Sequence, residues 1–370
     1  MPTARYGIAF GDYLNSSAKL TPQYAKHISF AVRQISYPKD ISQIRKDLFH
    51  YKKKGYQIMN IVFMGTPDFA VPCLEELIKS GHNVTGVFTQ PDKPKNRGQK
   101  MQFSPVKECA VKYDIPVFQP LSLRKGEDGE KSLEILKEQN PDCIVVAAYG
   151  QILPKAVLDL PKYGCINVHA SLLPKYRGAA PIQHCIIDGE KKTGITIMYM
   201  AEGLDTGDMI ISEEVEIHER MTASELHDRF TEISGPLLLK ALEQLENGTA
   251  VRTPQTDENT CYASMISKEM CRIDFTKSSE EVYNFIRGMS ASPCAFTTLG
   301  GKRLKVYFAE KTNIKTDAEA GTTADDGLSV ACGDGYAVRL SDIQLEGSKR
   351  MNISDFLRGR KVEKGVKLGE

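Results

Sequence analysis

The 370-residue sequence lacks tryptophan, C-x-x-C pairs and long apolar runs, and each absence narrows the possible functions. Its longest uninterrupted apolar run, from Cys143 to Tyr149, is far too short to cross a bilayer, so we expect no membrane partner. The nine cysteines, an odd number, are scattered without metal-ligand spacing, which argues against a disulfide framework and a zinc site. A reducing, cytoplasmic compartment is therefore expected. Without tryptophan, stacking of an indole on a nucleic-acid base is excluded.

The sequence also lacks a dinucleotide-binding motif. Gly65-Thr66-Pro67 follows the first apolar run, but the spacing G-x-G-x-x-G is absent. Thr89-Gln90 stands at the end of the next expected strand, where an acidic residue would bind the ribose of the cofactor. We therefore expect no NAD.

Charge is distributed unevenly along the chain. The formal net charge is +1, but residues 1–58 hold ten Lys or Arg against three Asp and no Glu, so the remainder is near −6. This basic extension lacks the apolar core of a signal peptide, and an apolar strand begins directly after it at Met59. We expect residues 1–58 to lie outside the catalytic fold, as read-through from an upstream start. An RNA-binding arm and an organellar presequence are the alternatives.

Residues 59–245 alternate short apolar runs with amphipathic helices. Strands are expected at 61–63, 84–89, 117–118, 144–148, 166–169, 195–199 and 215–217. Helices are expected at 71–78, 106–113, 131–138 and after the capping box Thr222-x-x-Glu225. Strands that alternate with helices form parallel sheets covered on both faces, so this part is predicted to be an α/β, Rossmann-like domain.

The remainder of the chain has a different pattern. Residues 246–264 are polar and rich in turn formers, which indicates a linker. From 265 to 370, one helix capped by Ser278-x-x-Glu281 is followed by short runs at 303–308, 328–331 and 336–340, separated by glycines. Short strands of this kind predict a small β-barrel domain.

The most informative segment runs from Cys165 to Pro181. Asn167 and His169 are two residues apart on a short apolar strand, so both side chains project from one face. Two donors at one point can hydrogen-bond an oxygen that becomes negative during acyl transfer, and Asp205 in a later turn can set the charge of the imidazole. The structural alternatives are a histidine satisfied within the core and an Asp that bonds its own turn.

These residues, together with the run Ser171-Leu172-Leu173-Pro174, resemble the signature of the folate-dependent formyltransferases. The start at Met59, the segment from Gln90 to Lys107 and the region after residue 260 extend the resemblance over about residues 59–370. Within the family they resemble the members that act on charged initiator tRNA. The resemblance implies transfer of the formyl group of 10-formyltetrahydrofolate to the α-amine of methionine on that tRNA, by a monomer.

The roles of the site residues are likewise implied by the resemblance. Asn167 and His169 would stabilise a tetrahedral oxyanion, and Asp205 would favour the charged imidazole, with no metal and no covalent enzyme intermediate. The expected folate-contacting residues are Ser171, Leu172, Leu173, Pro174, Tyr149, Gly150 and Ile152. Ordinary core packing is the alternative for the two leucines and for Tyr149.

Contacts to tRNA are expected on two basic segments. The resemblance places Arg97, in the loop that also holds Lys93, Lys95 and Lys100, against the acceptor arm; a solvated loop is the alternative. It also implies an OB-like C-terminal domain that binds tRNA, with contacts from Lys302, Arg303 and Lys305. From residue 265 onward, seventeen basic residues face fifteen acidic ones, so clustering must provide the attraction to phosphates.

Three other functions remain open at this stage. The same chemistry could serve a small amine, such as an amino sugar nucleotide or glycinamide ribonucleotide. Water could replace the amine, which would make the protein a formyltetrahydrofolate hydrolase. A folate- or RNA-binding module without turnover is the third. The C-terminal barrel and the Arg97 loop favour a tRNA acceptor, because a small acceptor needs neither.

Overall fold

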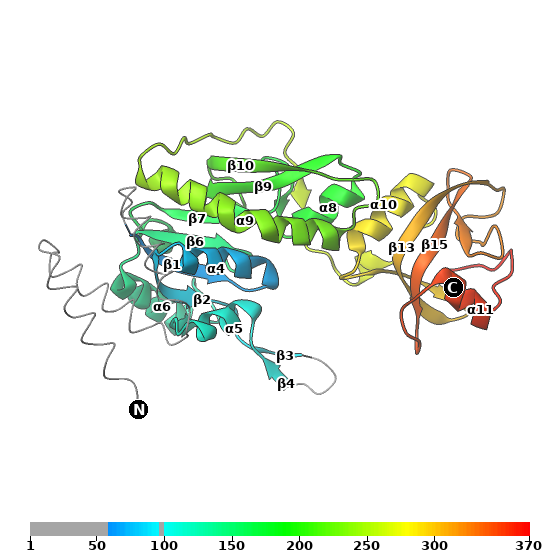
Figure 1. Cartoon of the computed structure of the whole chain (residues 1–370), viewed down its shortest axis with the longest axis horizontal. Coiled ribbons are helices and arrows are strands. Elements are labelled where there is room, and N and C mark those ends of the chain that lie inside the picture. The colour runs from blue at the N-terminus through cyan, green and yellow to red at the C-terminus, as the bar shows by residue number, and fades with distance from the viewer. Residues whose placement is uncertain (1–57, 96–99) are drawn as a thin grey trace, which may run out of the picture.

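The computed structural model describes residues 58–95 and 100–370. Apart from Ile58, the predicted N-terminal extension therefore lies outside the described residues, as does Arg97. Two units lie next to each other along the long axis, joined by the segment that follows helix α9, Ala223–Glu246 (Figure 1). No helix of the described residues combines the length and the apolar character of a membrane span.

The first unit is built on a seven-stranded sheet of order β10-β9-β7-β6-β1-β2-β5. Its strands are β1 (Asn60–Gly65), β2 (Asn83–Phe88), β5 (Val117–Phe118), β6 (Cys143–Ala147), β7 (Cys165–His169), β9 (Lys192–Tyr199) and β10 (Met209–Glu216). Strands β1, β2, β5, β6 and β7 are mutually parallel, as the alternation of strands and helices predicted. All seven expected strands are present, with bounds that differ by a few residues.

At one end the sheet contains antiparallel strands, which the sequence did not indicate. Strand β9 runs antiparallel to β7, and β10 antiparallel to β9. The connection from β7 to β9 contains the short helix α8 (Pro181–Ile187), which packs against α10 (Ser279–Met289) of the second unit. The chain therefore makes no crossover along the sheet and enters β9 in the reverse direction.

Helices cover both faces of this sheet. Alternation along β1 sends Ile61 and Phe63 to one face, where α4 (Val71–Lys79), α5 (Pro105–Lys112) and α9 pack. It sends Val62 and Met64 to the other face, beneath α6 (Gly126–Gln139) and α7 (Lys155–Leu158). Helix α9 begins with both hydrogen bonds of the predicted capping box, whereas α6 begins five residues before the expected 131.

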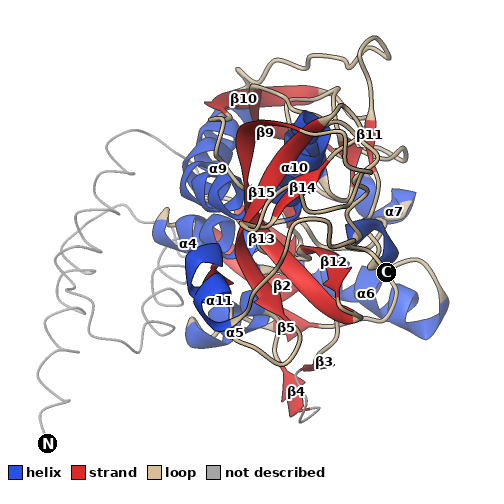
Figure 2. Cartoon of the chain, turned by 90° about the vertical axis from the view of Figure 1, so that its right-hand side faces the viewer, coloured by secondary structure: helices blue, strands red, loops and turns tan. Residues whose placement is uncertain are grey.

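The second unit is an antiparallel sheet of order β12-β13-β15-β14, with β16 paired to β15. Its strands are β12 (Ala295–Leu299), β13 (Lys302–Lys315), β14 (Ser329–Ala331), β15 (Tyr336–Leu345) and β16 (Met351–Asn352). Five strands are the number found in an OB fold. Helices α10 and α11 (Ile353–Gly359) accompany this sheet, and α10 begins with the predicted capping box (Figure 2). The expected fold class, a parallel-sheet domain followed by a small β domain, is confirmed.

Several short elements were not predicted. Among them are the hairpin β3 (Lys93–Lys95) and β4 (Lys100–Gln102), the strands β8 (Arg177–Gly178) and β11 (Tyr262–Ala263), and the 3₁₀ helices η1 (Asp68–Ala70) and η2 (Glu269–Cys271). Strands β12 and β16 and helices α7, α8 and α11 were not predicted either. Strands β8 and β11 pair in parallel, so the segment predicted as a linker ends in a strand attached to the first unit. Two residues are too few to show a period, which is why the sequence did not indicate them.

A close helix crossing joins the two units. At Gly288 in α10, a Cβ atom would lie 2.6 Å from the Ile187 side chain and 3.1 Å from the carbonyl oxygen of Gln183, both in α8. Beside it, the buried Arg287 guanidinium donates hydrogen bonds to Asn284 and to the carbonyl of Met221. The contact between α8 and α10 therefore brings the two helix backbones close together, and the buried guanidinium of Arg287 has hydrogen-bond acceptors there.

Candidate active site

Asn167 and His169 lie on the same face of β7. Ile166 and Val168 pack in the hydrophobic cluster beneath α4 and α9, whereas Cys165 packs in the cluster beneath α6 and α7. Residues of a strand alternate between faces, so Asn167 and His169 share the side of Cys165. Within the described part of the chain, no hydrogen bond occupies the Asn167 carboxamide, which leaves it available to a reacting group.

The orientation of His169 is fixed by one hydrogen bond. The side chain is 5% exposed, and its Nε2 lies 2.9 Å from the carbonyl oxygen of Tyr176. A carbonyl oxygen only accepts, so Nε2 carries the hydrogen. The other nitrogen, Nδ1, faces Asp205 Oδ2 at 3.6 Å, which is longer than a hydrogen bond. Nδ1 is therefore the ring nitrogen that is left to interact with a substrate.

Asp205 reaches this point from the connection between β9 and β10. That connection starts beside the first residue of β7, where the Met200 N–H donates to the Cys165 carbonyl. Asp205 has a left-handed backbone (φ +51°), and its Oδ2 accepts a 2.8 Å hydrogen bond from the N–H of Gly178. The alternative of an Asp that bonds its own turn is therefore wrong, because the partner of the carboxylate lies 27 residues away.

The predicted Ser171–Pro174 run forms a loop that is tied to β9. The hydroxyl of Ser171 donates to the carbonyl of Lys175 at 2.6 Å, and the hydroxyl of Thr196 donates to the carbonyl of Ser171 at 2.7 Å. Leu173 is buried and its N–H donates to the same threonine hydroxyl, while Leu172 and Pro174 are partly exposed. For Leu173 the structure thus agrees with the packing alternative.

The other expected folate residues follow β6. Tyr149 is 2% exposed within the cluster beneath α6, and its hydroxyl has no hydrogen-bond partner among the described residues. Burial raises the pKa of this phenol. The packing alternative therefore holds for the Tyr149 side chain, which lies behind the surface. Gly150 (φ +84°) and Ile152, 62% exposed, lie on the surface.

Backbone and side-chain hydrogen bonds tie together the carboxyl ends of three strands here. The carbonyl of Tyr149, after β6, accepts from the Thr66 hydroxyl after β1 at 2.9 Å and from the Gln90 carboxamide after β2 at 3.2 Å. Strand β1 lies between β2 and β6, so this edge is the point where the strand order reverses. Ligands of open α/β sheets bind at such a point, and His169 ends the next strand of the same edge.

The basic residues expected to contact tRNA lie on two projecting surfaces. The β3–β4 hairpin extends away from the first unit, and Lys93 is exposed on it (Figure 1). Lys95 and Lys100 are opposite each other in its backbone register. The base of the hairpin is held by Lys107, whose Nζ donates to Asp92 at 2.5 Å and to Gln119 at 2.7 Å. That lysine is thus occupied within the chain.

On the second unit, Lys302, Arg303 and Lys305 lie on β13. Leu304 and Val306 are fully buried, so Arg303 and Lys305 face outward from the core of this unit. The Arg303 guanidinium lies 3.8 Å from the centre of the Phe296 ring. This outward face therefore combines cationic and aromatic side chains.

Several residues that hold the site together were not predicted. They are Thr196, Tyr176, Arg177, Gly178 and Gln255. Thr196 offered a signal, because it is a polar residue within the otherwise apolar run Ile195–Tyr199. Gln255 offered no signal, because it lies in a polar stretch in which a glutamine forms no recognisable pattern with its neighbours.

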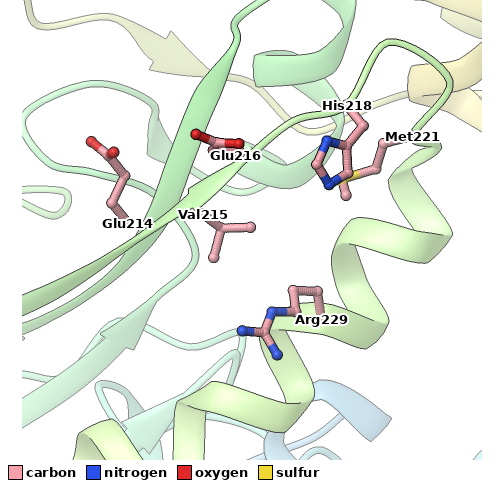
Figure 3. Close-up of a pocket in the computed structure, with 6 residues that line it drawn as sticks. All are labelled: Glu214, Val215, Glu216, His218, Met221 and Arg229. Carbon is pink, nitrogen blue, oxygen red and sulfur yellow. The ribbon is translucent and has the colours of Figure 1, made fainter.

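A separate hollow of about 280 Å³ lies between the end of β10 and the start of α9 (Figure 3). It is lined by Glu214, Val215, Glu216, His218, Met221 and Arg229. Val215 packs in the cluster beneath α9, so the hollow lies on the opposite face of the sheet from Asn167 and His169. Its arginine already donates to Glu232 at 2.8 Å, and none of the predicted site residues lines it.

The described residues contain no group of three or more His, Cys, Asp or Glu side chains placed to hold a metal ion.

Comparison with known families gives two matches that together span most of the chain. The model of the formyl transferase family matches residues 59–242, and that of the formyl transferase C-terminal domain matches residues 265–361.

Curated relatives are similar over their whole length. A methionyl-tRNA formyltransferase of Alkaliphilus oremlandii is 51% identical over 315 residues, which is 84% of this chain and 100% of the relative. One from Clostridioides difficile is 48% identical over 314 residues, with the same coverage of each chain.

Solved structures share the fold at lower identity. The sugar 3N-formyl transferase WlaRD, solved with dTDP and 5-N-formyl-THF, has a TM-score of 0.58 at 20% identity and covers 79% of this chain and 100% of that one. HypX from Aquifex aeolicus, solved with tetrahydrofolic acid, has a TM-score of 0.55 at 17% identity. That match covers 81% of this chain and 47% of HypX.

Proposed function

The chain belongs to the formyl transferase family, and from this we propose that it transfers the formyl group of 10-formyltetrahydrofolate to the α-amine of methionyl-initiator tRNA. The observation that carries the proposal is the convergence of His169 and Asp205 beside Asn167 at the carboxyl end of β7. Near-half identity to methionyl-tRNA formyltransferases over their full length supports the tRNA acceptor.

The first catalytic task is to stabilise the oxyanion that forms when the amine attacks the formyl carbon. The Asn167 carboxamide N–H and a protonated His169 Nδ1–H are the two donors that this strand face offers. Each such donor contributes roughly 3 kcal/mol where water is excluded. The bond from Nε2 to the Tyr176 carbonyl holds the ring, so little reorganisation is needed during the reaction.

The second task is to move protons. Asp205 Oδ2 accepts from the Gly178 N–H and lies 3.6 Å from His169 Nδ1, so the carboxylate faces the ring nitrogen that is left to interact with a substrate. The same carboxylate, or a water on it, accepts the proton of the attacking amine. When the bond from the formyl carbon to the folate nitrogen breaks, the oxyanion becomes a carbonyl again and the folate nitrogen receives the proton that the amine gave up.

The folate co-substrate fits the edge where β1, β2 and β6 end. Gly150 has no Cβ and is exposed there, so a flat ring can approach the backbone, and the exposed Ile152 offers apolar contact. We assign backbone contacts to Tyr149, Leu172 and Pro174, and a supporting role to the buried Ser171 and Leu173. Co-crystal contacts elsewhere on the sheet would contradict this assignment.

The tRNA is proposed to contact both projecting basic surfaces. Lys93, Lys95, Arg97 and Lys100 of the hairpin would meet the acceptor arm, and Lys302, Arg303 and Lys305 would follow the phosphate backbone on the second unit. Two separated basic surfaces can hold a nucleic acid while its aminoacyl end reaches the sheet edge.

The domain boundaries that we propose are 59–245 for catalysis and 265–370 for tRNA binding, and the family-model limits of 242 and 265 support them. We further propose that the protein acts as a monomer in the cytoplasm, where charged initiator tRNA is used. Sedimentation velocity, with and without tRNA, would measure the state of association.

One assay separates the candidate functions. The purified chain is incubated with 10-formyltetrahydrofolate labelled in the formyl group and with charged initiator tRNA, an amino sugar nucleotide, or no acceptor. Label on methionyl-tRNA alone is expected. Label in free formate without an acceptor would indicate a hydrolase, and label on the sugar would indicate a small-amine transferase.

A further inference from the structure

The segment that connects the two units touches the catalytic residues directly. Between Val251 and Asn259 every residue is exposed except Gln255, which is partly buried. Its Nε2 donates to the carbonyl of Asp205 and to the carbonyl of Gly207, both at 2.8 Å, and its Oε1 accepts from Arg177 Nε at 2.9 Å. Carbonyls only accept and the guanidinium only donates, so these partners fix which end of the carboxamide faces the turn.

Besides the bonds from Gln255, the turn that holds Asp205 accepts a hydrogen bond from the Gly178 N–H at the Asp205 carboxylate and one from the Tyr199 N–H at the Asp208 carbonyl, both at 2.8 Å. Gly203, Leu204 and Thr206 are exposed, and the Asp205 backbone is in the left-handed region, which costs energy for a residue with a side chain. Two carbonyls of this turn, at Asp205 and Gly207, are bonded by the single carboxamide of Gln255. The Gly178 N–H holds the carboxylate itself, and the backbone that carries it is held by a residue 50 positions further along the chain.

Three consecutive residues connect this contact to the histidine. Tyr176 accepts from His169, Arg177 donates to Gln255, and Gly178 donates to the Asp205 carboxylate. The same tripeptide pairs through β8 with β11: the Arg177 N–H donates to the carbonyl of Cys261 at 3.0 Å. At Gly178 a Cβ would lie 2.6 Å from the Ala263 carbonyl oxygen, so the connecting strand packs directly on the backbone of the loop.

We propose that Gln255 is a positioning residue for the reaction: it holds the Asp205 turn so that the carboxylate faces His169 Nδ1, and it thereby makes the interdomain connection part of the active site. This inference rests on the proposed function, since Asp205 matters only if it takes part in transfer. Gln255 itself touches no reacting atom. A displacement of about 1 Å in a positioned group can cost roughly 10²-fold in rate.

The test compares four variants of the full chain in steady-state formylation of charged initiator tRNA. Gln255→Ala should lower kcat by about 10- to 100-fold, with KM for folate and for tRNA within about twofold of wild type. Gln255→Glu keeps an acceptor for Arg177 but replaces the donor to the two carbonyls, so it should be at least as slow. Thr256→Ala, an exposed neighbour, is the matched control and should retain wild-type kcat.

The fourth variant shows whether Gln255 acts through Asp205. In the Asp205→Asn background, Gln255→Ala should change kcat by less than about twofold, because residues that act as one unit are not additive. If the kcat of the double variant falls by the product of the two single-variant losses, the proposal is overturned. A Gln255→Glu variant with wild-type kcat would also overturn it. A parallel loss of tRNA binding in Gln255→Ala would also overturn it, since that indicates a structural role alone.

A second readout does not depend on activity. Hydrogen–deuterium exchange of the Gly178 N–H, which donates to the Asp205 carboxylate at 2.8 Å, should be faster in Gln255→Ala than in wild type and in Thr256→Ala, because the turn that holds the carboxylate loses two hydrogen bonds at its carbonyls. Unchanged exchange would contradict the role of Gln255. If wild type shows this protection but no transfer to tRNA, the proposed function fails while the hydrogen-bond contact stands.

Discussion

His169 uses its two ring nitrogens differently. Nε2 is committed to the Tyr176 carbonyl, and Nδ1 is directed toward Asp205. Because the carboxylate is fixed by the Gly178 N–H and not by a bond to the imidazole, it can approach the ring or a substrate proton with little movement. At the scale of single residues, the chemistry therefore depends on how one carboxylate is shared.

Asp205→Asn tests this arrangement. The amide oxygen can still accept from the Gly178 N–H, so the turn should keep its shape, but the negative charge is lost. We expect kcat to fall by at least about 10²-fold. The Kd for tRNA, measured by filter binding, should stay within about twofold. Equal losses in kcat and in tRNA affinity would implicate folding instead.

His82 provides a prediction for stability in acid. Its Nδ1 accepts from the Met59 N–H at 3.3 Å, and burial lowers the pKa of His82 from its usual 6.5 to about 4. Between these values the unfolded chain binds a proton that the folded chain does not, so the free energy of unfolding should decrease as pH falls from about 6.5 to 4. Urea denaturation at several pH values should show a smaller decrease for His82→Gln. If the free energy of unfolding decreases with pH as steeply in His82→Gln as in wild type, other groups cause the acid sensitivity.

The residues that were predictable are those with a local pattern. Asn167 and His169 were predicted from their spacing on an apolar strand, and Asp205 from its place in a glycine-rich turn. Gln255 and Arg177 could not be found in this way. Their importance arises from pairing between segments about 80 residues apart, and pairing at that distance leaves no periodicity in either segment.

At the scale of elements, the crossing of α8 and α10 determines how the two units are joined. Gly288→Ala should force the helices apart, because the new methyl group would meet the Gln183 carbonyl oxygen and the Ile187 backbone nitrogen, at 3.1 and 3.2 Å. Overpacking of this kind costs about 1–3 kcal/mol. Thermal unfolding should show a lower Tm. Gly359→Ala, in α11 with no atom within 4 Å of the new methyl, is the matched control and should leave Tm unchanged or slightly higher.

The basic hairpin can be tested as an element by its salt dependence. Arg97→Ala should weaken tRNA binding and reduce the slope of log K against log salt by about one phosphate contact, or 0.7–0.9. Arg124→Ala removes an exposed cation outside the hairpin and serves as control. A slope that does not change in Arg97→Ala would reject the contact.

Long periodic elements were predictable, and short or reversed ones were not. The strand at β7 and the capped starts of α9 and α10 followed from alternation and from capping boxes. The direction of β9 did not, because an antiparallel strand has the same apolar pattern as a parallel one when both faces are covered. Helix α8, which lies between β7 and β9, packs against α10 of the second unit, and a contact at that separation leaves no pattern in the sequence.

At the scale of the whole molecule, one experiment concerns the length of the chain. The first predicted strand begins beside Met59, and curated relatives match 84% of this chain over their full length. A protein that starts at Met59 should retain kcat and tRNA affinity within about twofold, which corresponds to less than about 0.5 kcal/mol in each. Lost activity, with an unchanged Tm, would assign a function to residues 1–58.

The two border strands of the large sheet bear on whether these molecules aggregate at high concentration. One border strand, β5, is only two residues long, and the other, β10, carries Glu213, Glu214 and Glu216. A neighbouring molecule that tried to extend the sheet would find almost no backbone to pair with at one border and a row of carboxylates at the other. The short strand at one border and the charged side chains at the other thus protect the sheet against fibre-like growth.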